Sequence, residues 1–278
     1  MEKEKFRLSR VLPIYIPLAA YLIFLLFPFY WTFVTSIKPE KELYSSVVTY
    51  WPNSTTFASY KKLFMSFNFF KPMINSLLVA VVTTIVSLAV SLLAAYAFSR
   101  YKFKGRKVLM AMFLTNNMFP TVLLLIPLYA IMRNMGILYT PTALVLSYTT
   151  FTIPFSIWLL NGYLRDLPIA LEEAAMIDGA TRAQAFLKIV FPILVPCLVA
   201  TGAYIFMTSW NEYVFAVMFT NEGNRTIPVT LNLLVGQLGV QWGMMTAAGI
   251  ITIIPVCIIL FFAQKRLTEG LTAGALKG

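Results

Sequence analysis

Histidine is absent from this 278-residue chain, and cysteine occurs only twice. Histidine is the commonest metal ligand and the commonest proton carrier near neutral pH, so its absence excludes the metal centres and proton relays that depend on it. The two cysteines, Cys197 and Cys257, each lie inside an apolar segment. They give no disulfide framework, and we expect them to pack as small apolar side chains.

Charged residues are also scarce. They make up 12% of the chain, whereas 59% of its residues are hydrophobic, and soluble domains contain about 25% charged residues. A chain this apolar cannot cover its surface with polar groups in water, so we expect it to lie in a lipid bilayer. The charges that give the net +11 lie between apolar segments rather than in one patch, which favours a membrane protein over a nucleic-acid-binding one.

Six segments without Asp, Glu, Lys or Arg are long enough to cross the bilayer core, which takes about 20 helical residues. Backbone groups find no partners in lipid, and the alternating pattern of barrel strands is absent, so the spans must be helices. The sequence therefore predicts an all-α membrane protein, a single transmembrane domain over residues 1–278 with six helices near 11–36, 73–98, 108–131, 140–162, 189–210 and 245–264.

The distribution of basic residues predicts the orientation. Of the 22 Lys and Arg residues, 15 fall on the side that contains both termini and 7 on the other. Because cytoplasmic segments are enriched in Lys and Arg, we expect both termini to be cytoplasmic. The segment 163–188 and the tail 265–278 then lie inside the cell, and the segments 38–71 and 211–243 lie outside.

The internal segment 163–188 is predicted to form a helix, a turn and a second helix. Pro168 suits a first helical turn, and Gly179 suits the left-handed position that ends a helix. Thr181 and Gln184 match a capping box for the second helix, which runs toward the fifth span. Small residues and two glutamates on the first helix suit docking of a soluble partner, since a carboxylate takes a charge-assisted bond from an Arg; an amphipathic connector lying on lipid is the alternative.

The chain has no visible energy source of its own. The cores of the spans contain no ionisable residues of the kind that ion-coupled transporters use. No Gly-Lys pair occurs, so the phosphate-binding loop of P-loop ATPases is absent too. A transporter built this way must take its energy from a partner, and a docking loop would provide the route.

The motif around Glu173 is specific. Glu173-Ala-Ala is followed after three residues by Gly179, and after nine more by Ile189 and then Pro192. This resembles the EAA loop of binding-protein-dependent ABC importer permeases, with Phe191 in place of the usual leucine. Three further stretches resemble the carbohydrate branch and its maltose-type second permease subunit: Asp178-Gly-Ala180, Trp210-Asn-Glu-Tyr213 and the tail Gly270-Leu-Thr-Ala-Gly-Ala-Leu-Lys-Gly278.

The resemblance implies a multi-pass permease subunit of the bacterial inner (plasma) membrane that is not itself an enzyme. Its expected partners are two copies of a cytoplasmic ATPase, which would bind the ATP and Mg while this chain binds no cofactor or metal, a second and different permease, and an extracytoplasmic sugar-binding protein. It also implies three sets of contact residues: the coupling loop (Glu172, Glu173, Ala174, Ala175, Asp178, Gly179), a tail between the ATPase subunits (Gly270, Leu271, Thr272, Ala273, Gly274) and a loop facing the binding protein (Asn221, Glu222, Asn224, Arg225).

A sugar pathway needs aromatic faces and neutral hydrogen-bonding groups rather than charge. The candidates for such a pathway are Asn116, Asn117, Thr150, Trp210 and Asn211. Each could instead bond a neighbouring helix, which is the commoner use of polar residues in membranes. An ion-coupled carrier or a passive channel for a neutral polar solute is the alternative function, and it leaves the EAA spacing unexplained.

Overall fold

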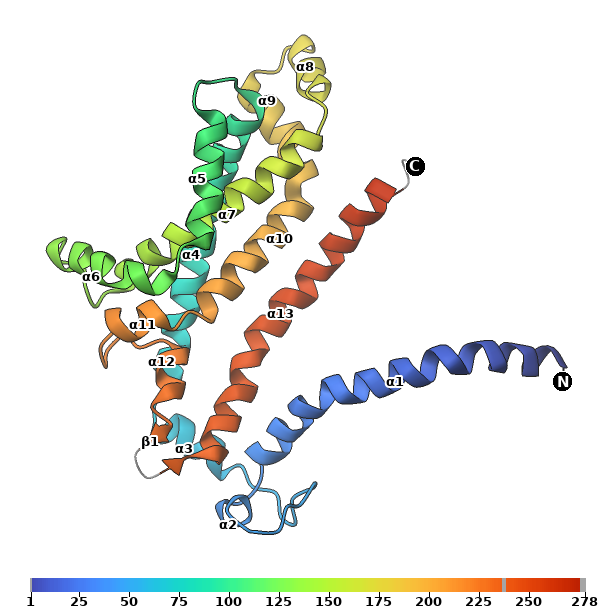
Figure 1. Ribbon diagram of the computed structural model, residues 1–278, viewed down its shortest axis with the longest axis vertical. Coiled ribbons are helices and arrows are strands. Elements are labelled where there is room, and N and C mark those ends of the chain that lie inside the picture. Colours follow the sequence, from blue (N-terminus) through green and yellow to red (C-terminus); the bar gives the residue numbers. More distant parts are fainter. Residues whose placement is uncertain (1, 237–238, 276–278) are drawn as a thin grey trace. The chain divides into compact units, whose positions relative to one another are not determined.

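The computed structural model describes residues 2–236 and 239–275, and these are overwhelmingly helical (Figure 1). Two compact units make up the chain, one formed by Met1–Phe69 and Leu233–Ile253 and the other by Phe70–Asn232 and Ile254–Gly278. Helix α13 (Trp242–Ala275) belongs to the first unit up to Ile253 and to the second beyond it. The prediction of a single domain remains a prediction.

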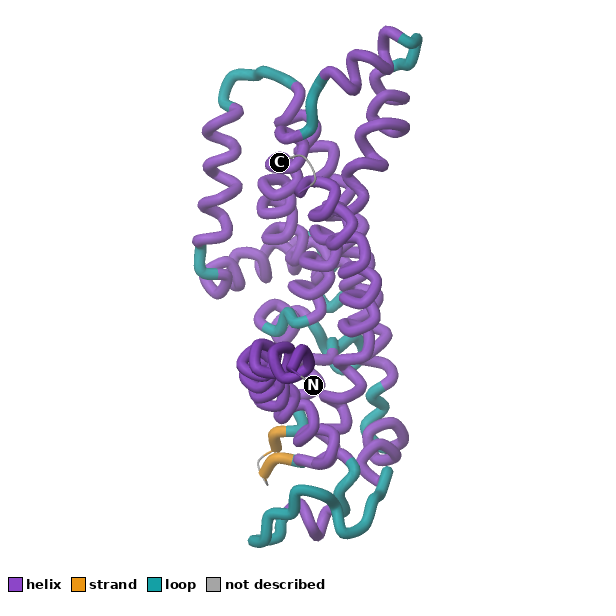
Figure 2. Tube along the Cα trace, turned by 90° about the vertical axis from the view of Figure 1, so that its right-hand side faces the viewer, coloured by secondary structure: helices purple, strands orange, loops and turns teal. Residues whose placement is uncertain are grey.

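The first unit contains α1 (Glu2–Ser36), α2 (Glu40–Leu43), α3 (Ala58–Met65) and a short antiparallel hairpin. The hairpin pairs β1 (Val235–Gly236) with β2 (Gly239–Val240) and is the strand pair visible in Figure 2. Lys38, after α1, is buried; its ammonium donates to the Thr49 carbonyl and lies 4.9 Å from the centre of the Trp31 ring.

The second unit is a helical bundle with short helices at both ends. Its long helices are α4 (Phe70–Arg100), α7 (Pro141–Asp166) and α10 (Phe191–Trp210). The shorter elements are α5 (Arg106–Met118), the 3₁₀ turn η1 (Thr121–Leu124), α6 (Leu125–Asn134), α8 (Ala170–Ile177), α9 (Arg182–Ala185), the π-helical turn η2 (Phe186–Val190), α11 (Val214–Phe219) and α12 (Ile227–Asn232). Figure 1 places α8 and α9 at one end of this bundle and α11 and α12 toward the other.

Helix α4 packs against α7 through a buried stripe of small polar residues. Ser87 and Thr152 share a hydrogen bond of 2.8 Å between their hydroxyls, and Ser91 donates to the Ile153 carbonyl. Thr152 also donates to the Tyr148 carbonyl one turn earlier. Small side chains let membrane helices approach closely, and hydroxyls in an apolar medium need such partners. The stripe therefore fixes how α4 lies against α7.

Two apolar clusters complete the bundle, one near each end. Leu92, Leu160, Leu164, Val190 and Leu194 pack together near α8. Tyr148 and Val79 pack with Phe215 and Phe219 of α11 near the other end.

Of the six predicted spans, five are single long helices in the described structure and the sixth is a bent pair. Among the described residues, five helices are long and apolar enough to cross a membrane: Pro13–Ser36, Phe70–Arg100, Pro141–Asp166, Arg182–Trp210 and Trp242–Gln264. The segment predicted as a span at 108–131 is instead a pair of helices bent by 101°. Pro120 explains the break, because it cannot donate a helical hydrogen bond and it keeps Phe119 in an extended conformation (ψ 130°).

Gly202 tests the close packing of α10 on α4. A Cβ at this position would lie 3.1 Å from Leu88 Cδ1 and 3.7 Å from Thr84 Cγ2. Gly202→Val should therefore destabilise the bundle by about 1–3 kcal/mol through overpacking. Gly162→Val in α7 is the matched control, since nothing lies within 4 Å of that position. Thermal denaturation in detergent should give a lower midpoint for Gly202→Val; equal midpoints would show that Leu88 moves aside without cost.

Candidate functional site: the loop between α7 and α10

The first half of the loop is a short helix with a sharp end. Helix α8 follows Pro168, which lies just before the helix and whose carbonyl accepts from the Leu171 amide. Gly179 takes a left-handed conformation (φ +89°). The amides of Gly179 and Ala180 bond back to the carbonyls of Met176 and Ala175, which is the Schellman pattern. The predicted end of this helix at Gly179 is confirmed.

The second half starts with the predicted capping box. The Thr181 hydroxyl accepts from the Gln184 amide, and the Gln184 side chain accepts from the Thr181 amide at 2.8 Å. From there α9, η2 and α10 form a continuous helical run that ends at Trp210. The loop is thus two short, separately capped helices at one end of α7 and α10, as the sequence predicts.

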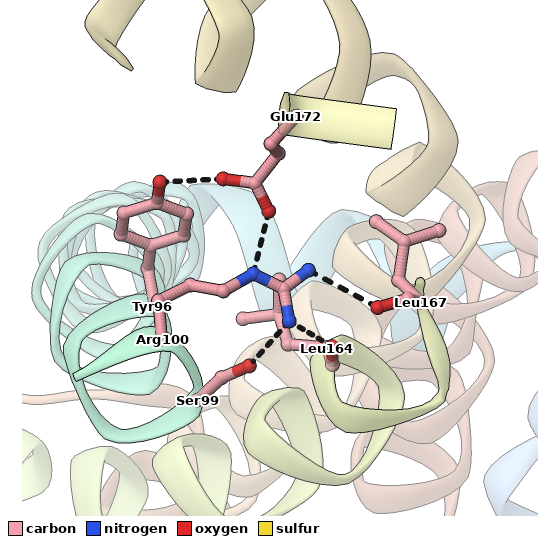
Figure 3. Close-up of polar contacts among 6 residues, drawn as sticks. All are labelled: Tyr96, Ser99, Arg100, Leu164, Leu167 and Glu172. Carbon is pink, nitrogen blue, oxygen red and sulfur yellow. Dashed lines mark hydrogen bonds and ion pairs between the residues drawn. The ribbon is translucent and has the colours of Figure 1, made fainter. Parts of the chain in front are cut away.

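Glu172 is the residue that fastens α8 to the bundle (Figure 3). Its carboxylate accepts from Arg100 Nε at 2.5 Å and from the Tyr96 hydroxyl at 2.6 Å. The Arg100 guanidinium also donates to the carbonyls of Leu164 and Leu167 at 2.9 and 3.3 Å, and to the hydroxyl of Ser99. Both charged side chains are about 95% buried, with exposed fractions of 5% and 6%. One ion pair therefore joins α8 to the ends of α4 and α7.

The structure separates the two neighbouring glutamates that the sequence groups together as docking residues. Glu172 faces the bundle and its carboxylate is already bonded, so a partner protein cannot contact it directly. Ala175 is half-buried on that side as well. The outward face consists of residues spaced three and four apart, namely Ala170, Glu173, Ala174 and Ile177, with Asp178 and Gly179 exposed beyond them.

Aromatic contacts fasten the second half of the loop to the same part of α4. The ring of Phe186, in η2, meets the Tyr96 ring edge-on with centroids 4.7 Å apart. The Arg182 guanidinium lies 5.4 Å from the centre of the Tyr101 ring. Both halves of the loop therefore contact the segment from Tyr96 to Tyr101.

Sequence reasoning missed three residues of this site. Arg100 counted only as a basic residue beside a span, and Tyr96 as part of the span itself. Ile177 is 86% exposed on α8. An apolar residue four positions after Glu173 was the available signal, since that spacing places both on one helix face.

The candidate pathway residues fall into two separate pairs. Asn116 donates to the Thr150 carbonyl at 3.0 Å, which joins α5 to α7, and the Thr150 hydroxyl donates to Leu146. Trp210 is 2% exposed, and its indole N–H has no partner among the described residues. The exposed Asn211 side chain donates to the Met207 carbonyl in its own helix. These hydrogen bonds of Asn116, Thr150 and Asn211 are therefore made within or between neighbouring helices and do not join the two pairs. The Asn117 side chain lies outside the described structure.

Glu212, within the Trp210–Tyr213 motif, lies two residues before the start of the short helix α11. Its two carboxylate oxygens accept from the amides of Phe215 and Ala216 at 2.9 and 3.1 Å, and so provide partners for two backbone donors in the first turn of the helix. Burial raises the pKa of this carboxyl, and the backbone hydrogen bonds partly oppose that rise. The acidic residue of the motif therefore has a local structural partner.

The loop predicted to face a binding protein is ordered by its own asparagines. The Asn224 side chain accepts from the Asn221 amide and donates to the Tyr139 carbonyl at 2.6 Å. Glu222 is 90% exposed and lies 4.0 Å from Arg225. On the inner side, the Asn75 side chain donates to the Arg225 carbonyl, and the Ser76 hydroxyl accepts from the Ile227 amide. The loop is therefore tied to the first turns of α4.

The tail residues Gly270–Gly274 lie within α13, and their side chains are outside the described structure. Among the residues that the structure does describe, no three Cys, Asp or Glu side chains gather as a metal site.

Comparison with known proteins gives consistent matches. Residues 87–272 match the family described as "Binding-protein-dependent transport system inner membrane component". The chain is 39% identical to the inner membrane ABC transporter permease protein YcjP of Escherichia coli, over the whole of both chains. It is 38% identical to the trehalose/maltose transport system permease protein MalG of Thermococcus litoralis, over 92% of this chain and 93% of that one.

A solved structure shares the fold. One chain of a bacterial ABC transporter involved in the import of the acidic polysaccharide alginate superposes with a TM-score of 0.77 at 24% identity, covering 93% of this chain and 97% of that one. With the family match over residues 87–272, these findings place the protein: it belongs to the binding-protein-dependent transport system inner membrane components, the permease subunits of ABC importers.

Proposed function

We propose that this permease imports a sugar or oligosaccharide. The trehalose/maltose permease among its relatives supports that substrate class. The candidate pathway groups are neutral amides, a hydroxyl and an indole, which suits an uncharged polyhydroxylated solute. Family membership favours this function over the ion-coupled carrier or passive channel that the composition alone left open.

The outward face of α8 is the observation on which the coupling role rests. Glu173 and Ile177 project from a helix whose opposite face is fixed by Glu172, with the small Ala170 and Ala174 beside them. Small residues allow close approach of another backbone, and an exposed carboxylate beside an apolar side chain suits a partner that offers an Arg next to a hydrophobic cleft. We infer that this face docks on a cytoplasmic ATPase, which binds and hydrolyses MgATP in two copies.

The remaining partners follow from the family. A second, different permease would complete the translocation pathway, and the tail Gly270–Gly274 would lie between the ATPase subunits. The loop Asn221–Arg225 would face an extracytoplasmic binding protein. Both termini and the α8–α9 loop would then be cytoplasmic, in agreement with the distribution of Lys and Arg.

Transport would proceed by alternating access. Closure of the ATPase dimer on ATP would move the docked loop, and hydrolysis would reset it. The permease needs two conformations that differ by about a few kcal/mol, so that ATP binding can shift the population between them. Of the described candidates, the side chains of Asn116, Thr150 and Asn211 are accessible to a sugar in this conformation, whereas the buried Trp210 would contact one only after the helices move.

Reversing the charge of Glu173 tests the docking face. Glu173→Lys would place a cation against the partner's Arg, so the ATPase should no longer co-purify with the tagged permease in mild detergent. Asp166→Lys is the matched control, because it makes the same charge change at an exposed position outside α8. Co-purification that survives Glu173→Lys would contradict docking through this face and favour a connector that lies on lipid.

Ile177 tests the apolar part of the same face. Burying a side chain of this size in an interface contributes about 1.5–3 kcal/mol, so Ile177→Ser should weaken ATPase binding about tenfold to a hundredfold. Leu187→Ser removes a similar, 61% exposed side chain from η2 and should leave the affinity unchanged. Titration of the ATPase against permease in nanodiscs measures both; equal affinities would place Ile177 outside the interface.

A further inference from the structure

Helix α4 contacts both of the surfaces at which this permease is proposed to meet its soluble partners. At its last turns, Arg100 and Tyr96 bind Glu172 of α8. At its first turns, Asn75 and Ser76 bind the backbone of the segment from Arg225 to Ile227, next to the loop Asn221–Arg225. The helix has 31 residues and is therefore about 46 Å long. One continuous helix thus joins the two sites.

The contact at the α8 end resists separation. The Arg100–Glu172 pair is almost entirely buried, and pulling its members apart would leave an uncompensated charge in an apolar setting. Arg100 has a second function at the same place, since it donates to the Leu164 and Leu167 carbonyls at the end of α7, which lack helical partners there. A displacement of α8 would therefore move the ends of α4 and α7 with it rather than slide past them.

The middle of α4 is suited to transmit such a displacement. The Ser87–Thr152 and Ser91–Ile153 hydrogen bonds join it to α7 within the bundle. Pro72 lies in the first turn of the helix, and no proline follows it. No proline kink therefore interrupts α4 between Ser76 and Arg100. At the far end, each of the two bonds to the 225–227 backbone comes from a side chain of α4 itself.

From these contacts we propose that α4 is the mechanical link between the ATPase-docking loop and the external loop, with Arg100 and Glu172 as positioning residues that fasten it to α8. The proposal rests on the function proposed above, in which α8 docks on the ATPase. It assigns the inward glutamate of the loop a separate task from the outward one: Glu173 meets the partner, and Glu172 passes the movement on. Because coupling between sites is reciprocal, an event at the external loop would also bias α8 through α4.

A label on the external loop tests this link without knowledge of the transported sugar. Glu222→Cys, at a 90% exposed position, takes a nitroxide label after Cys197 and Cys257 are replaced by serine. The permease is purified with its ATPase and trapped with MgADP and vanadate. The parent chain should show a change in the label's spectrum on trapping.

Three substitutions then remove the side-chain contacts at one end of α4 or the other. Arg100→Lys keeps the charge but loses the fork of donors, Glu172→Gln removes the carboxylate charge, and Asn75→Ala removes the contact with Arg225. Each should keep its ATPase, while the spectral change on trapping falls about fivefold or more, the lower end of measured coupling between protein sites. Arg165→Gln, an exposed arginine at the same end of the bundle, is the matched control and should keep the full change.

The outcomes separate the two proposals. If no ATPase co-purifies with the parent chain, the docking function itself fails; if the ATPase co-purifies and the label does not respond to trapping, docking stands and the link through α4 is overturned. If the parent responds and Arg100→Lys, Glu172→Gln and Asn75→Ala respond equally well, docking stands and the link through α4 is overturned. Should the charge variants not fold, Tyr96→Phe and Asn75→Ala leave the ion pair intact and decide the question by the same measurement.

Discussion

The structure of this site depends on one buried ion pair between Arg100 and Glu172. Two charges lie with almost no exposure among leucines at the end of the bundle, and each is satisfied only by the other and by nearby hydroxyl and carbonyl groups. Such a pair adds little to stability compared with well-packed apolar residues, but removing one partner is costly. The pair therefore fixes the position of α8 relative to α4 and α7. Which face of α8 points outward follows from that position. The exposure of Glu173 and Ile177 is a consequence of where Glu172 is bound.

The other helices of the bundle are also held in defined positions, but by close packing and hydroxyl hydrogen bonds rather than by an ion pair. Within the membrane-spanning part, apolar side chains gain nothing by leaving lipid for one another, so small residues and hydroxyl hydrogen bonds decide how the helices meet. Ser87, Ser91 and Thr152 do this between α4 and α7, and Gly202 does it between α10 and α4. A helix held at both ends by polar contacts and in its middle by close packing behaves as one body, and α4 meets each of these conditions.

Much of this could be predicted from the sequence, and the exceptions have physical causes. The spans, the end of α8 at Gly179 and the capping box at Thr181 follow from local rules, because each depends on residues within a turn of one another. Pro120 was visible as a helix breaker, but the sequence could not say that the two halves would bend by 101° rather than kink slightly. Local sequence rules could not tell the two glutamates apart either, although the EAA pattern begins at Glu173. They are adjacent in sequence and about 100° apart around the helix, and which one turns inward is decided by Arg100, 72 residues earlier in the chain.

The charge of the outward face bears on whether α8 meets protein or lipid. Once Glu172 is neutralised by Arg100, the exposed side chains of α8 and its cap include the carboxylates of Glu173 and Asp178 and the apolar Leu171 and Ile177. Helices that lie on the cytoplasmic leaflet place Lys and Arg toward its anionic headgroups, and acidic residues there are repelled. An acidic surface flanked by these two apolar side chains is thus poorly matched to the anionic membrane surface and well matched to a basic protein surface with an apolar cleft. The ion pair that removes the inward glutamate from the surface leaves the outward one as the group that such a partner would recognise.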